Sequence, residues 1–184
     1  MNSRPGTDYF ELFGLSPAFA IDMEQLSLRY RELQRSAHPD RFASASAQEK
    51  RISVQQAALI NEAYQVLRTP LSRGRYMLAR LGANIDDTDT SMEPTFLMEQ
   101  MELREALAAV TASDDPFASL DSLRDRIEAM EREMVAQLQQ LLDTNDTPGS
   151  DDLQRGIQLV RKMQFIQRLL GEVDELEDQL AHVG

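Results

Sequence analysis

The 184-residue chain contains no cysteine and only two histidines, His38 and His182. Without thiols it can form neither a disulfide nor a thiolate metal site, and it has no cysteine nucleophile. Because imidazoles are also few, the sequence excludes zinc and redox chemistry. We expect no metal site and no cofactor. Apolar runs are short, and none approaches the roughly 18 residues that a membrane-spanning helix needs. We therefore expect a protein that does not enter a membrane.

Val and Ile are scarce, numbering 14 together against 24 Leu, whereas Ala, Glu, Gln, Met and Arg are abundant. The chain thus has few of the β-branched residues that strands favour and many residues that helices favour. The sequence therefore predicts an all-α fold with no sheet.

Negative charge is concentrated in the second half of the chain, whose total net charge is −12. Residues 1–82 hold 11 Lys or Arg and 8 Asp or Glu, whereas residues 83–184 hold 8 and 23. This difference predicts two modules with different partners, and the basic excess of the first is too small for nucleic-acid binding. The first ten residues show neither a signal-peptide pattern nor an Arg-rich amphipathic one, so we expect a cytoplasmic protein.

Apolar spacing and helix-ending residues predict four helices in residues 1–82. Asp22 is a suitable N-cap for the second helix, and His38-Pro39-Asp40 ends it, because proline disfavours a helical residue before it. The third helix carries an apolar stripe from Ile52 to Leu67 and forms a hairpin with the second. The expected ranges are 9–13, 23–37, 47–67 and a connecting helix at 71–81.

Residues 83–95 are rich in Asp, Thr, Ser and Pro, and we interpret them as a polar linker. Residues 96–184 form the second module. Helical spacing predicts three long helices at about 95–111, 117–142 and 152–181, each with one apolar stripe. An antiparallel three-helix bundle would bury all three stripes.

His38 and Asp40 stand together at the break between the second and third helices, and three interpretations are open. An acid–base site would need a nucleophile and an orienting group that no motif supplies, so we expect no enzyme. A simple helix stop is the second interpretation. The third is a docking surface for an acidic protein, because a basic stripe approaches the loop. That stripe consists of Arg31, Arg35, Arg41, Lys50 and Arg51. A basic stripe by itself is also consistent with a role in solubility alone.

Three motifs of the first module resemble those of a J-domain: YFELFGL at 9–15, HPDRF at 38–42 and INEAYQVL at 60–67. PLSR at 70–73 and FLMEQMELRE at 96–105 narrow the resemblance to the HscB family, bacterial co-chaperones of iron–sulfur cluster assembly. The resemblance extends from about Asp8 to Leu180. The resemblance implies an L-shaped protein, with a J-domain and its connecting helix in residues 1–82 and a scaffold-binding bundle in 96–184.

The resemblance also implies two protein partners. The J-domain would stimulate the ATPase of HscA, a DnaK-type chaperone, and the bundle would bring it the scaffold IscU for cluster maturation and transfer. The residues expected to bind the chaperone are Arg31, Arg35, His38, Pro39, Asp40, Arg41 and Phe42. Those expected to bind the scaffold are Leu97, Met98, Met101, Glu102, Glu105 and Phe165. The chain departs from the family pattern at Met101, where leucine is common, and at Ala109, where an acidic residue often extends the surface.

A helical wheel supports part of this surface without reference to the family. Leu97, Met98 and Met101 lie opposite the apolar face that begins at Phe96, so they stay exposed unless the connecting helix folds over them. Phe165 likewise falls outside the apolar stripe of its helix, although a residue at the edge of the core would also fit. Two alternatives remain open: a J-protein with another client, and an adaptor that self-associates through this surface. We expect a monomer.

Overall fold

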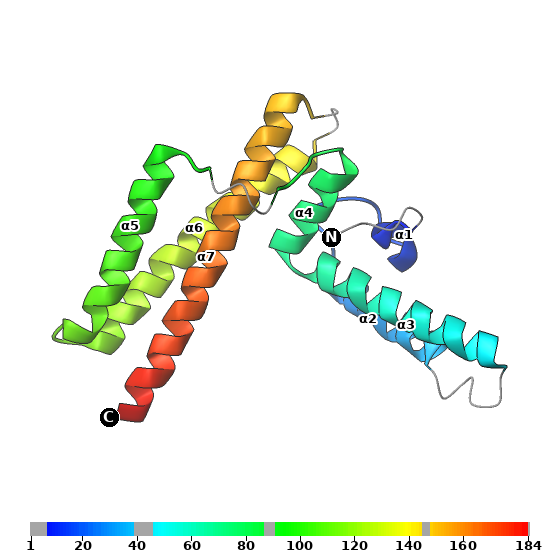
Figure 1. Cartoon of the computed structure of the whole chain (residues 1–184), viewed down its shortest axis with the longest axis horizontal. Coiled ribbons are helices and arrows are strands. Elements are labelled where there is room, and N and C mark those ends of the chain that lie inside the picture. The colour runs from blue at the N-terminus through cyan, green and yellow to red at the C-terminus, as the bar shows by residue number, and fades with distance from the viewer. Residues whose placement is uncertain (1–6, 39–45, 87–90, 145–147, 184) are drawn as a thin grey trace. The chain divides into compact units, whose positions relative to one another are not determined.

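The computed structural model describes residues 7–38, 46–86, 91–144 and 148–183 (Figure 1). These ranges are mainly helical and contain no strand, which confirms the predicted all-α fold. Within these ranges, no helix combines the length and the hydropathy that a membrane span requires. The chain divides into two compact units, Met1–Met77 and Leu78–Gly184. The division falls inside helix α4 (Pro70–Arg80), whereas we expected the first module to continue to residue 82.

Unit 1 has its helices at the predicted places: α1 (Tyr9–Phe13), α2 (Met23–Ala37), α3 (Ala47–Arg68) and most of α4. Asp22 caps α2 by accepting hydrogen bonds from the backbone N–H groups of Glu24 (2.9 Å) and Gln25 (3.0 Å). At the start of α3, Ser46 and Glu49 form a reciprocal capping box. Local sequence therefore sets where both helices of the hairpin begin.

The hairpin of α2 and α3 is joined by an aromatic pair, in which Tyr30 stacks on Tyr64 with ring centroids 4.0 Å apart. The sequence predicts Ile52 on the buried stripe of α3, and this prediction is wrong, because Ile52 is exposed. The next residue, Ser53, is buried at the same place along α3. The buried face of this turn therefore passes through Ser53, and Ile52 lies outside it.

Helix α1 is held against the rest of unit 1 by Tyr9 and by two buried phenylalanines, Phe10 and Phe13. The Tyr9 hydroxyl donates to the Glu62 carboxylate of α3 (3.0 Å), and the Tyr9 ring stacks on Tyr76 of α4, with centroids 4.6 Å apart. Burial and the hydrogen bond to Glu62 raise the pKa of Tyr9 to about 12. Tyr9 therefore stays a neutral hydrogen-bond donor throughout the physiological pH range.

Unit 2 is the predicted antiparallel three-helix bundle (Figure 1). Its helices are α5 (Pro94–Ala109), α6 (Pro116–Leu142) and α7 (Ser150–Val183), and a short 3-10 helix, η2 (Val110–Ala112), follows α5. Arg124 of α6 donates hydrogen bonds to Asp174 (2.6 Å) and Glu177 (2.6 Å), which joins α6 to α7. Fully buried apolar side chains of this unit include Leu103, Leu120, Ile127, Leu138, Met163 and Ile166.

Candidate docking sites

Helix α2 carries an exposed basic face, formed by Arg31 and Arg35. The Arg31 Nε donates to the carbonyl oxygen of Ser27 (3.3 Å), so the side chain lies back along the helix. Among the described residues, neither arginine has a carboxylate within salt-bridge distance, whereas the neighbouring Arg29 pairs with Glu32 (3.0 Å). The two charges of the basic face are therefore available to an acidic partner.

His38 is the C-cap of α2, and its extended conformation (φ −63°, ψ 129°) is that expected of a residue before proline. It is exposed, on the same helix as the basic face. The other predicted residues of this docking surface lie outside the described residues: Pro39, Asp40, Arg41 and Phe42. Lys50 and Arg51, which continue the basic stripe, are exposed near the start of α3.

Helix α5 exposes three large apolar side chains, Leu97, Met98 and Met101, which together are called the apolar patch. The exposed fractions are 45% for Leu97, 65% for Met98 and 63% for Met101. The opposite side of α5 buries Phe96 and Leu103 in the bundle. The exposure of all three side chains that the helical wheel predicts is thus confirmed. Exposed apolar clusters of this kind are typical of protein-binding surfaces.

Two exposed carboxylates, Glu102 and Glu105, accompany the apolar patch on α5. Glu102 accepts a hydrogen bond from the Arg126 guanidinium of α6 (3.3 Å), which partly neutralises its charge. Glu105 has no cation within salt-bridge distance in the part of the chain that the structure describes. Ala109, one turn further on, is exposed and adds no charge. The surface therefore combines apolar contact with one unpaired negative charge.

Phe165 is buried, with 4% of its surface exposed, so the prediction that it lies off the core is wrong. Its ring meets Phe96 of α5 edge to face, with centroids 5.8 Å apart, and the Arg104 guanidinium lies 5.6 Å from its centroid. The apolar stripe predicted on α7 is wide enough to pack against only one neighbouring helix. Because α7 packs against both α6 and α5, a wider arc of it is buried. Phe165 therefore supports the helix that carries the apolar patch.

Two adjacent cations of α7 hold the segment that leads into α5. Arg161 is buried, and its Nη1 donates to the carbonyl oxygen (3.4 Å) and the hydroxyl oxygen (3.3 Å) of Ser91. The Lys162 Nζ donates to Glu93 (2.7 Å) and lies 5.3 Å from the centroid of Phe96. Neither cation is predicted from the sequence, and Arg161 gives no local signal, because it lies opposite the apolar stripe of α7 on a helical wheel. Together they fix the N-terminal end of α5.

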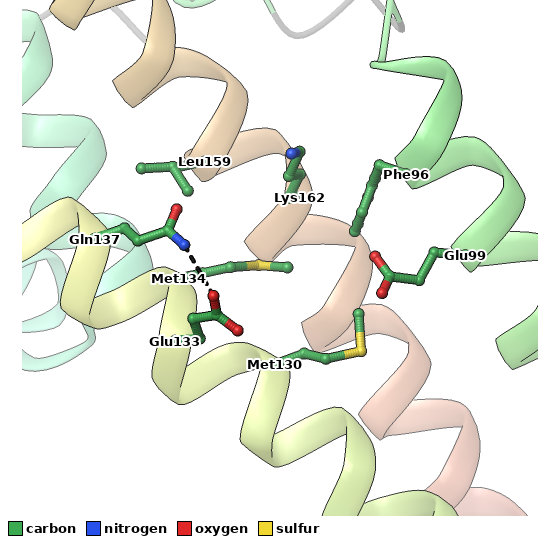
Figure 2. Close-up of a pocket in the computed structure, with 8 residues that line it drawn as sticks. All are labelled: Phe96, Glu99, Met130, Glu133, Met134, Gln137, Leu159 and Lys162. Carbon is green, nitrogen blue, oxygen red and sulfur yellow. Dashed lines mark hydrogen bonds between the residues drawn. The ribbon is translucent and has the colours of Figure 1, made fainter.

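A cleft of about 230 Å³ lies between α5, α6 and α7 (Figure 2). Figure 2 shows the thioethers of Met130 and Met134 among its lining side chains, close to the carboxylate-bearing Glu99 and Glu133. No serine or histidine lines it, and the described residues include no cluster of three or more His, Asp or Glu that could hold a metal ion. We therefore take the two docking surfaces, which match the predicted residues, as the candidate sites. Its lining residues are Phe96, Glu99, Met130, Glu133, Met134, Gln137, Leu159 and Lys162.

Replacing Phe165 by alanine is expected to destabilise the bundle by about 3–5 kcal/mol, the usual cost of deleting a buried aromatic ring. Leu97→Ala, a change on the exposed face of the adjacent helix, should cost no more than about 0.5 kcal/mol. Urea denaturation followed by circular dichroism measures both. Equal stabilities for the two variants would contradict the burial of Phe165.

Comparison with known proteins gives consistent matches over nearly the whole chain. A family profile described as "HSCB C-terminal oligomerisation domain" matches residues 92–174. A co-chaperone protein HscB homolog from Vibrio cholerae is 45% identical over 174 residues, covering 94% of this chain and 98% of the relative. The solved structure of chaperone HscB from Vibrio cholerae has a TM-score of 0.84 at 44% identity, covering 95% of this chain and 99% of that one. Human co-chaperone HscB has a TM-score of 0.83 at 30% identity, covering 95% and 84%.

Proposed function

The chain belongs to the HscB family of co-chaperones, and on this basis we propose that it couples two proteins of iron–sulfur cluster assembly. Its J-domain stimulates ATP hydrolysis by HscA, a DnaK-type chaperone, and its bundle delivers the scaffold IscU for maturation and transfer of the cluster. The ATPase activity belongs to the chaperone. The cysteines that hold the cluster belong to the scaffold, since this chain has none. The proposed location is the cytoplasm.

The apolar patch on α5 is the observation that carries the proposal for the bundle. Its three side chains lie on a helix fixed at its start by Arg161 and Lys162, so the backbone that carries them is already ordered before a partner covers them. A matching surface on IscU is apolar and provides a cation for Glu105. We assign Phe165 a supporting role in this surface, because it is buried beside Phe96.

Mixing the purified chain with IscU and measuring molar mass by light scattering tests this proposal. We expect a monomer that forms a complex of the summed mass. The second candidate is a self-associating adaptor, favoured by the exposed apolar patch and by the description of the matching profile as an oligomerisation domain. A stable oligomer that does not bind IscU would support the self-associating adaptor. A monomer that does not bind IscU would indicate another client.

The basic face of α2 supports the proposal for the J-domain, because unpaired exposed cations attract an acidic surface over long range. Reversing both charges in the double variant Arg31→Glu and Arg35→Glu is expected to reduce the rate of association with HscA at least about tenfold at low salt. The loss should shrink as salt is added, since exposed charges are screened within about 8 Å at physiological ionic strength. Surface plasmon resonance at several salt concentrations measures the association rate of the parent and of the double variant. A decrease in this rate that does not depend on salt would contradict the electrostatic role.

A further inference from the structure

Leu28 is an exposed leucine in the middle of the outer surface of α2, with 51% of its surface accessible. It precedes Arg31 by three residues and Arg35 by seven, which places all three side chains on one face of the helix. Leu26, only two residues earlier, points into the core and is fully buried. The burial of Leu26 therefore provides the packing of this turn, and Leu28 contributes little to it.

The surroundings of Leu28 are apolar as well as basic. The hydrogen bond from the Arg31 Nε to the Ser27 carbonyl oxygen directs that side chain back toward the turn that holds Leu28. The methylene groups of an arginine in this position extend the apolar surface of the leucine while the guanidinium remains in water. Leu28 and the stem of Arg31 thus form a small apolar surface. Arg31 and Arg35 continue it toward the end of α2, and two exposed carboxylates, Glu24 and the Arg29-paired Glu32, lie one turn before and one turn after Leu28.

The charges beside Leu28 indicate the chemistry of the surface that would cover it. In unit 2 most described cations are already paired, for example Arg124 with Asp174 and Lys162 with Glu93. On α2, by contrast, Arg31 and Arg35 have no carboxylate within salt-bridge distance among the described residues. A complementary surface is therefore acidic where it meets the two arginines and apolar where it meets Leu28.

We propose that Leu28 is the apolar contact residue with which α2 docks on an acidic, partly apolar surface of the DnaK-type chaperone. This inference rests on the proposed function and names a further residue of the docking surface. The arginines accelerate the encounter through their charge, whereas the leucine slows dissociation, because a desolvated apolar contact acts only in the formed complex. The two kinds of contact are therefore separable by kinetics.

The test compares Leu28→Ala with the parent chain in full-length protein, using chaperone ATPase stimulation without scaffold and surface plasmon resonance. We expect the half-saturating concentration to rise about tenfold, through faster dissociation, with an unchanged association rate and an unchanged salt dependence. Leu28→Met, which keeps an apolar side chain of similar volume, should behave like the parent. Phe117→Ala, which removes an equally exposed apolar side chain of α6, should have no effect.

The outcomes separate this inference from the proposed function. If Leu28→Ala stimulates the chaperone like the parent while the Arg31 and Arg35 reversal weakens docking, the inference alone is wrong. If neither variant changes the stimulation, the proposed role of the basic face is wrong as well. A similar loss of stimulation in Phe117→Ala would show that any exposed apolar side chain has this effect. That result would overturn the assignment to Leu28. Melting temperatures within a degree or two of the parent are required, because Leu28 lies outside the core.

Discussion

Replacing Leu97, Met98 and Met101 together by alanine is expected to weaken the binding of IscU by about 1,000-fold or more, which corresponds to about 4 kcal/mol. Central apolar side chains of an interface often contribute about 2 kcal/mol or more each when truncated, and their effects are not additive. Isothermal titration calorimetry with IscU measures the change. Of all the substitutions considered, this one should affect scaffold binding most.

The same triple variant should fold and melt like the parent. All three side chains are exposed on α5, so their truncation leaves no cavity, and alanine favours the helix. Stimulation of HscA without the scaffold should also stay unchanged, because the basic face is on unit 1. The loss would then be confined to one partner.

Phe117→Ala is the matched control, since Phe117 is exposed on α6 and does not belong to the apolar patch. It should bind IscU as the parent does. Normal IscU affinity in a triple variant that melts normally would show that the client binds elsewhere. A large fall in the melting temperature would show instead that the patch belongs to the core. Phe165 is left out of the variant because its removal would confuse binding with stability.

The ends of the helices in unit 1 could be predicted because their signals are local. Asp22 accepts hydrogen bonds from the first turn of α2, and Gly14 ends α1 in a left-handed conformation (φ 64°) that favours glycine. Each signal acts within about four residues of its helix. No knowledge of the tertiary fold is needed to identify them.

The errors at Ile52 and Phe165 arise from packing between helices. Periodicity along one helix indicates which residues share a face, but it does not indicate where on that face a neighbour packs or how many neighbours there are. The start of α3 buries Ser53 in place of Ile52, and Phe165 faces a second helix. Both facts depend on residues distant in sequence.

The sequence predicts which types of side chain form the candidate sites. It predicts only part of the geometry of these sites. The exposure of Met98 and Met101 follows from their place opposite Phe96 on the same helix. The contact between Arg161 and Ser91 joins residues 70 positions apart, so no local pattern reveals it. Tertiary contacts of this kind decide how firmly the patch is held.

Asp40→Asn is expected to abolish stimulation of the HscA ATPase at ordinary concentrations. In the sequence, Asp40 follows His38 and Pro39 after the end of α2, and we propose that its carboxylate pairs with a cation of the chaperone. Removing one member of a charged pair that becomes buried on binding costs about 2–5 kcal/mol. That cost raises the half-saturating concentration by about 30-fold to 5,000-fold. Steady-state ATPase assays over a range of co-chaperone concentrations measure it.

Asparagine has the size of aspartate, so the substitution tests the charge with little change in shape. Helical circular dichroism and IscU binding should therefore match the parent. Glu11→Gln, which removes an exposed carboxylate of α1 elsewhere in unit 1, is the control and should stimulate normally. His38→Gln should resemble Asp40→Asn if the two residues bind the chaperone as one unit. Near-normal stimulation by a folded Asp40→Asn protein would refute the assignment and leave Arg31, Arg35 and Leu28 as the docking surface of α2.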